Sequence, residues 1–109
     1  MKIIVYNLLF ALITFMIIDF IMCIIRAVIE KNLSSNKGRD FIFKKIIIFL
    51  LVAATYVLDI FVLQNDAGNV LTITVLSFYI TNEGIGILEN AKALGLPIPK
   101  TLTKVFKEK

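Results

Sequence analysis

Few residues in this sequence could carry acid–base or ligand chemistry, and their types argue against catalysis. The chain of 109 residues contains no histidine and one cysteine, Cys23. Without histidine, the usual general base, the Ser-His-Asp and Cys-His arrangements and the common zinc ligand sets are missing. One cysteine cannot form a disulfide within the chain or a multi-cysteine metal site. We therefore expect no enzyme, no metal and no cofactor, and we interpret Cys23 as a packing residue.

Three acidic residues remain as candidates, and each interrupts an otherwise apolar run. They are Asp19 in residues 3–25, Asp59 in residues 46–63 and Glu83 in residues 70–88. A helix needs about 20 residues to cross the hydrocarbon core of a bilayer, and helices pair all their backbone groups internally. The runs also lack the alternation of a membrane β-strand. Acids in such segments usually face a protein interior or water, so they are candidates for function.

The composition agrees with a membrane protein. Hydrophobic residues make up 59% of the chain and charged residues 18%, against roughly 45–50% and about 25% in soluble domains. A small soluble domain cannot bury that much apolar surface, and disorder requires low hydrophobicity. The sequence predicts a single all-α integral membrane domain over residues 1–109. It has three transmembrane helices (about 3–25, 46–63 and 70–88) and a short C-terminal amphipathic helix in a basic tail, residues 89–109.

The distribution of basic residues predicts the orientation. Six lysines and arginines lie in residues 26–45 and five in residues 89–109, whereas residues 64–69 contain none. The positive-inside rule places both basic segments in the cytoplasm, with the N-terminus outside and the C-terminus inside. Asp19 and Glu83 should then share a cytoplasmic layer near Lys44 and Lys45, with Asp59 near the outer side. Membrane topology accounts for the net charge of +4, so we expect no nucleic-acid partner.

The third apolar run has a polar side. At 100° per residue, one face carries Ile73, Leu76, Ile80, Ile87 and Leu94. The opposite side carries Thr74, Thr81, Asn82, Gly86, Glu89 and Asn90, with Glu83 at the edge between them. In a membrane these polar groups either hold the helices of one chain together, or pair between chains and line an aqueous lesion. The sequence leaves both alternatives open. The residues proposed for self-association or lesion lining are Asp19, Asp59, Asn82, Glu83, Gly86, Glu89 and Asn90.

The links and the tail contain turn and break signals. Residues 30–40 read as a polar link with breakers at Ser34, Ser35, Asn36 and Gly38, and residues 64–69 have the composition of a tight turn that makes a helical hairpin. Gly95 suits the position just beyond a helix C-terminus, and Pro97 and Pro99 prevent the helix from continuing. The apolar residues that follow have helical spacing, among lysines, and we interpret this piece as resting on anionic lipid. They are Leu102, Val105 and Phe106.

The sequence resembles the bacteriophage holin family that includes clostridial toxin-secretion holins. The resemblance runs from about Ile18 to Phe106 and includes the long string ENAKALGLPIP. Its motifs are Asn82-Glu83-Gly84, Ile87-Leu88-Glu89-Asn90 and Gly95-Leu96-Pro97-Ile98-Pro99 in the second half, and Asp19, Arg26-Ala27, Glu30-Lys31, Ser34-Ser35, Lys45 and Asp59 in the first. Two departures concern packing. Ile21-Met22-Cys23 stands where relatives often have small residues, and Gly86 stands where they often have serine.

The resemblance implies a protein of the bacterial cytoplasmic membrane that self-associates and triggers abruptly. Its lesion would let a cytosolic endolysin, or in some members a toxin, reach the outside. The expected partners are therefore further copies of the chain, membrane lipid, and an endolysin or secreted toxin as functional partner. Two other classes remain open: a small ion-channel or transporter subunit that uses the intramembrane acids, and a structural membrane partner of a larger complex.

Overall fold

The computed structural model of the chain describes residues 2–31, 35–63 and 69–107. Three long helices form a bundle: α1 (Lys2–Ile29), α2 (Ser35–Val57) and α3 (Val70–Ala93). A π-helical turn, η1 (Leu58–Val62), continues α2, and a short helix, α4 (Lys100–Lys107), follows α3. All three long helices are long and apolar enough to cross a membrane. The predicted all-α fold, with three such helices and a short C-terminal helix, is confirmed.

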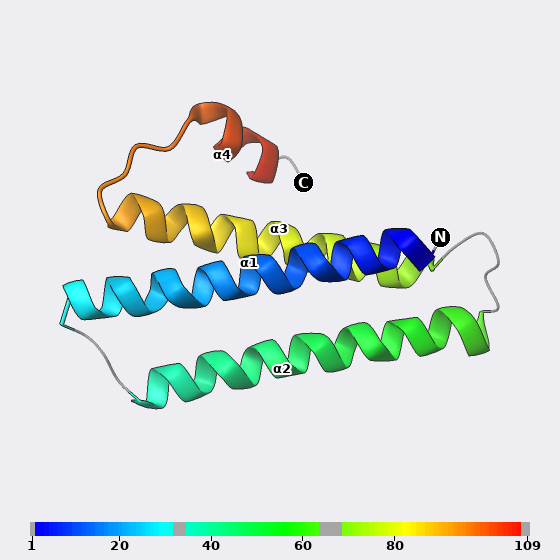
Figure 1. Cartoon of the computed structure of the whole chain (residues 1–109). Helices are drawn as coiled ribbons and strands as arrows, with labels where there is room; N and C mark the ends of the chain where they lie inside the picture. Colours follow the sequence, from blue (N-terminus) through cyan, green and yellow to red (C-terminus); the bar gives the residue numbers. More distant parts are fainter. Residues whose placement is uncertain (1, 32–34, 64–68, 108–109) are drawn as a thin grey trace.

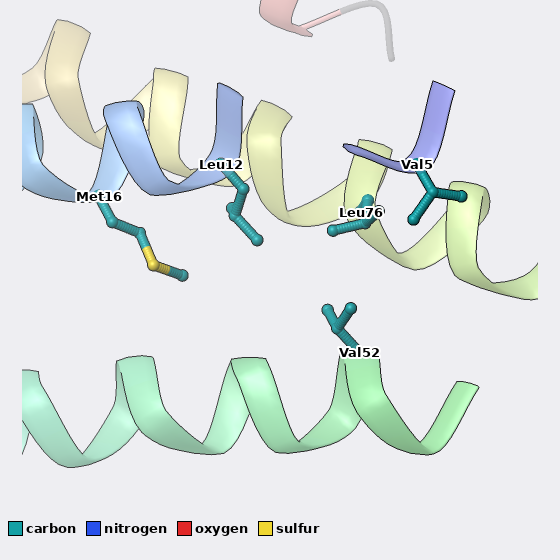
Figure 2. Packing of buried hydrophobic residues seen from close by; sticks show 5 residues of the cluster. All are labelled: Val5, Leu12, Met16, Val52 and Leu76. Atoms are coloured by element: carbon teal, nitrogen blue, oxygen red, sulfur yellow. The ribbon is translucent and has the colours of Figure 1, made fainter. Parts of the chain in front are cut away.

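The helices alternate in direction, so α1 and α3 run parallel and α2 runs antiparallel to both (Figure 1). Helix α1 packs mainly along α3, and α2 also packs mainly against α3. The core is small and lies where the three helices meet (Figure 2). It consists of Val5, Leu12, Met16, Val52 and Leu76. Most large apolar side chains point outward instead, as expected for helices that face lipid.

The prediction that residues 30–40 form a link is wrong for most of its length, because α2 already begins at Ser35. Serine and asparagine disfavour helix interiors but suit a first turn, where Asn36 accepts a hydrogen bond from Arg39 (3.1 Å). Gly38 lies in that same exposed end and has open space around it. Glycine in a helix costs about 1 kcal/mol relative to alanine. That cost is small beside the stabilisation from packing of the apolar residues that follow. The predicted turn at 64–69 lies, apart from Asn69, outside the described residues.

The predicted end of the third helix is confirmed in detail. Helix α3 ends at Ala93, and Gly95 adopts a left-handed conformation with φ of 89°. The Leu96 N–H donates to the Ala91 carbonyl (3.0 Å), and the Gly95 N–H donates to the Lys92 carbonyl (3.0 Å). This pair of bonds is a Schellman motif. It satisfies the last carbonyls of α3 and turns the chain, so that α4 lies back beside α3 (Figure 1).

Candidate functional site

Three charged side chains from three helices meet inside the bundle, about 15 Å along the helices from the end where α1 ends and α2 begins. Lys45 of α2 donates to both carboxylate oxygens of Glu83 on α3, at 2.6 and 2.7 Å. The same Lys45 Nζ lies 3.8 Å from Asp19 Oδ2 on α1. Both carboxylates are buried, with 8% of the Asp19 side chain and 3% of the Glu83 side chain exposed. One ammonium group therefore lies between acids from two other helices and contacts both.

A hydrogen-bond network extends this trio toward the ends of α1 and α3. The Asn90 amide donates to Asp19 Oδ1 (2.9 Å) and to the Cys23 sulfur (3.3 Å). Arg26 donates to the side-chain oxygen Oδ1 of Asn90 (3.2 Å) and pairs with Glu30 (3.2 Å) on its own helix. Cys23 is thus a member of a polar network, which its prediction as a packing residue missed. We call Asp19, Cys23, Arg26, Lys45, Glu83 and Asn90 the polar cluster.

Two packing features hold the polar cluster together. Gly86 faces Asp19 so closely that a Cβ placed there would lie 3.3 Å from Oδ1 of that carboxylate. Glycine at this position lets α3 approach the acid on α1. On the other side, the Lys45 ammonium lies 4.4 Å from the centre of the Phe41 ring, and that ring packs against Phe20 of α1 at 5.4 Å. A cation over an aromatic face is attracted to it, so Phe41 helps to fix the lysine.

The membrane environment makes this pairing obligatory. An isolated charge in the hydrocarbon region costs several kcal/mol, so buried charges there pair with one another. In the part of the chain that the structure describes, every buried side-chain nitrogen or oxygen has a hydrogen-bond partner. Such a buried pair adds little net stability compared with apolar packing, but removing one partner leaves the other charge uncompensated. The polar cluster therefore specifies one arrangement of the helices.

Asp59 lies at the opposite end of the bundle and acts differently. It belongs to η1, is 0% exposed, and accepts hydrogen bonds from the backbone N–H groups of Leu71 (3.2 Å) and Thr72 (2.8 Å) and from the Thr72 hydroxyl (2.8 Å). Those N–H groups lie in the first turn of α3, where helices lack internal partners. The adjacent Asn69 makes no side-chain capping bond. Asp59 therefore caps α3 from the end of α2.

The remaining polar residues of α3 point away from the bundle. Asn82 and Glu89 are exposed, and no hydrogen bond or ion pair joins either of them to another described residue. Thr74 and Thr81 on the same side use their hydroxyls on their own helix, donating to carbonyls four residues earlier. Asn82 lies about 10 Å deeper along α3 than Glu89, at 1.5 Å per residue. In a single copy of the chain, the Asn82 amide therefore faces lipid without a hydrogen-bond partner among the described residues.

The sequence analysis placed some of these residues correctly and others not. Asp19 and Glu83 do share a layer with Lys45, and Asp59 lies apart at the other end, as predicted. The predicted polar side of α3 is divided: Gly86 and Asn90 face α1, as in the alternative in which polar groups hold one chain together, whereas Asn82 and Glu89 point outward. Glu83, predicted at the edge of the polar side, is buried. The inner side of α3 mixes apolar and polar positions at heptad spacing. It consists of Thr72, Leu76, Tyr79, Glu83, Gly86 and Asn90.

The structure therefore divides the seven predicted site residues into three groups. Asp19, Glu83, Gly86 and Asn90 form or contact the polar cluster, Asp59 caps α3, and Asn82 and Glu89 point outward. Their proposed role in self-association or lesion lining stays a prediction. Arg26 and Lys45 belong to the site as well. Both stand among the motifs of the family resemblance, and the charge distribution also placed Lys45 beside the two acids. Among the described residues, no group of three acids, cysteines or histidines could hold a metal ion.

The pairing of Lys45 with two acids predicts an order of destabilisation. Lys45→Met leaves two buried carboxylates without a cation and should lower the free energy of unfolding by about 3 kcal/mol or more. Glu83→Gln should cost less, because Lys45 keeps Asp19 as a partner. Unfolding in mixed detergent micelles, followed by circular dichroism, measures both, and Lys44→Met at the exposed neighbouring position is the control. An equal or larger effect of Glu83→Gln would contradict this account of the cluster.

The capping role of Asp59 makes a separate prediction. Asp59→Asn keeps one acceptor oxygen but loses the charge, and should destabilise the first turn of α3 by about 1–2 kcal/mol. Asp59→Leu should cost more, because three donors lose their partner. Hydrogen exchange of the Leu71 and Thr72 amides should accelerate in both variants and stay unchanged in Asp40→Asn, which alters an exposed acid of α2. Unchanged exchange in Asp59→Leu would refute the cap.

Comparison with known proteins gives the family. The sequence model of the bacteriophage holin family matches residues 4–108. An uncharacterised protein of Clostridium perfringens is 39% identical over 89% of this chain and 70% of its own length. An uncharacterised protein of Clostridium acetobutylicum is 35% identical over 92% of this chain and 78% of its own length. A probable holin of Bacillus phage phi105 is 36% identical over 80% of this chain and 62% of its own length. No solved structure matches.

The matched residues include the whole polar cluster, the Asp59 cap and the turn at Gly95. Three apolar helices of spanning length agree with a multi-pass membrane protein. The chain belongs to the bacteriophage holin family.

Proposed function

We propose that this chain is a phage-type holin, which assembles in the bacterial cytoplasmic membrane and opens lesions for an endolysin. Family membership supports the class of protein. The structural observation that carries the proposal is Asn82, an outward amide in a membrane helix that has no partner among the described residues. A hydrogen-bonding group in lipid gains most from a partner on another helix. A second copy of the same helix supplies such a partner.

The polar cluster suits the resting state of such a protein. While its charges are paired inside one copy, they offer no path for water through the membrane. We propose that copies first associate through the side of α3 that carries Asn82 and Glu89. Above a critical density, the assemblies rearrange so that Asn82, Glu83 and Glu89 face water. Hydration then replaces the partners that the cluster loses, so the rearranged state does not leave buried charges unpaired.

The proposed orientation follows from the charge distribution and places the polar cluster near the cytoplasmic side. The basic residues at 26–45 and 89–109 lie at that end of the bundle, so the N-terminus lies outside and the C-terminus inside. The Asp59 cap then lies near the outer side.

A proton or ion relay, the competing channel function, would need polar groups along the whole path. Asp59 lies at the far end from Asp19 and Glu83 and is occupied by three hydrogen bonds.

Lysis of bacteria tests the proposal directly. The chain is expressed from an inducible promoter together with a cytosolic endolysin that has no signal peptide, while optical density and membrane potential are followed. The expected result is abrupt lysis after a lag, which requires both proteins. Steady growth with an intact potential, despite accumulation of the protein in the membrane, would reject the lesion function. In that case, copurification of one stoichiometric partner would favour a structural role in a complex. The same assay, with a secreted toxin in place of the endolysin, compares the two cargoes.

Substitution of Asn82 tests the self-association step. Asn82→Leu removes the outward amide without touching the core, so the protein should accumulate and keep its helical content while lysis is delayed or lost. Asn82→Gln keeps the amide and should retain lysis. The control is Phe78→Leu, which changes an apolar residue that is 63% exposed on the same side of α3. Cross-linking in membranes measures association in each variant. If Asn82→Leu lyses cells with the timing of the unaltered chain, Asn82 has no part in assembly.

A further inference from the structure

Helix α4 has an apolar side that the described chain leaves about half exposed. Leu102 and Val105 lie three residues apart, on one side of the helix, and are 45% and 49% exposed. Lys100 and Lys104 project from the opposite side at 100° per residue and are also exposed. Short helices with apolar residues on one side and lysines on the other lie at the boundary between headgroups and acyl chains.

The turn after α3 sets the place of α4. The left-handed Gly95 ends α3, Pro97 and Pro99 keep the next residues out of a helix, and the first bonds of α4 run from Leu102 and Thr103 to the Pro99 carbonyl. As a result, α4 contacts α3 and lies back alongside it, and does not project beyond the bundle (Figure 1). It therefore lies beside the C-terminal half of α3 (Figure 1). The bilayer around the bundle offers an apolar medium for Leu102 and Val105.

Charge decides between lipid and a second copy as the partner. Residues 95–107 contain three lysines and no acid. Two copies of α4 placed side by side would bring like charges together, which opposes association. Anionic headgroups offer the complementary charge, and lysines near such a surface bind it in a salt-dependent way. We propose that α4 binds anionic phospholipid headgroups, with Leu102 and Val105 inserted below them.

This contact links lipid composition to the site. Only six residues, 94–99, separate α4 from the end of α3, and α3 carries Glu83 and Asn90 on its inner side. An α4 held at the headgroup boundary fixes the depth of the C-terminal part of α3. Anionic lipid thereby sets how deep the polar cluster lies, which is a property that neither the helix core nor the Asp59 cap determines.

Depth-dependent quenching tests the proposal on the full chain. A single cysteine is placed at Val105 or at Thr103, which lies 160° away around the helix and carries no charge, in a Cys23→Ser background. Each variant is labelled with an environment-sensitive fluorophore. Both are reconstituted in phosphatidylcholine vesicles with or without phosphatidylglycerol, using lipids brominated in the acyl chain as quenchers. The expected result is several-fold stronger quenching at position 105 than at 103 in the anionic vesicles, reduced by salt and by omission of phosphatidylglycerol.

Two results would overturn the proposal. Equal quenching at both positions would show that α4 has no membrane-facing side, and quenching at 105 that ignores phosphatidylglycerol and salt would remove the anionic partner. Shielding at 105 that depends on the ratio of protein to lipid would assign this side of α4 to a second copy. Circular dichroism of both labelled variants checks that the helical content is unchanged, and both positions lie outside the bundle core.

Discussion

The ammonium group of Lys45 is the only direct charge partner for two buried carboxylates among the described residues, and the arrangement of the bundle depends on it. Asp19 and Glu83 come from α1 and α3, and Lys45 comes from α2. Lipid offers neither water nor counterions to compensate a separated charge, so the three helices must meet at this level. The close approach at Gly86 and the ring of Phe41 serve the same contact. Apolar packing alone, with a small core, would leave the rotation of each helix poorly defined.

Buried carboxylates serve different purposes at two levels of the bundle. Inside the bundle, carboxylates meet a side-chain cation and join three helices through the polar cluster. Near one end, the carboxylate of Asp59 meets backbone N–H groups and starts α3. The π-helical turn that carries Asp59 is closed by the bond from the Leu63 N–H to the Leu58 carbonyl (2.8 Å). Irregular turns of this kind often occur where a side chain needs a special position, and here the turn carries the carboxylate that reaches the next helix.

The fold followed from the sequence because membrane spans depend on length and hydropathy. The end of α3 was equally predictable, because only glycine adopts the φ of Gly95 without strain. The inner side of α3 was not, because apolar residues need not face inward in a lipid environment. Ile80 and Ile87 outline an apolar side, yet the interior follows Glu83 and Asn90, whose partners lie 38 to 71 residues away in the chain. The network around Cys23 depends on such a distant contact, and the Asp59 cap joins residues 12 and 13 positions apart across a link between two helices. Periodicity within one helix contains neither.

In the proposed mechanism, the polar cluster is closed in the resting protein and opens to water in the lesion, and the native Cys23 reports on this change. Its sulfur lies 3.3 Å from the Asn90 amide within the cluster. The measurement is the rate at which a water-soluble maleimide modifies Cys23 in cells, sampled before and after the loss of membrane potential, with Cys23→Ser as the blank and a detergent-denatured sample as the upper limit. We expect slow modification before triggering and a steep rise after it. The same rate before and after triggering would contradict an opening of the polar cluster.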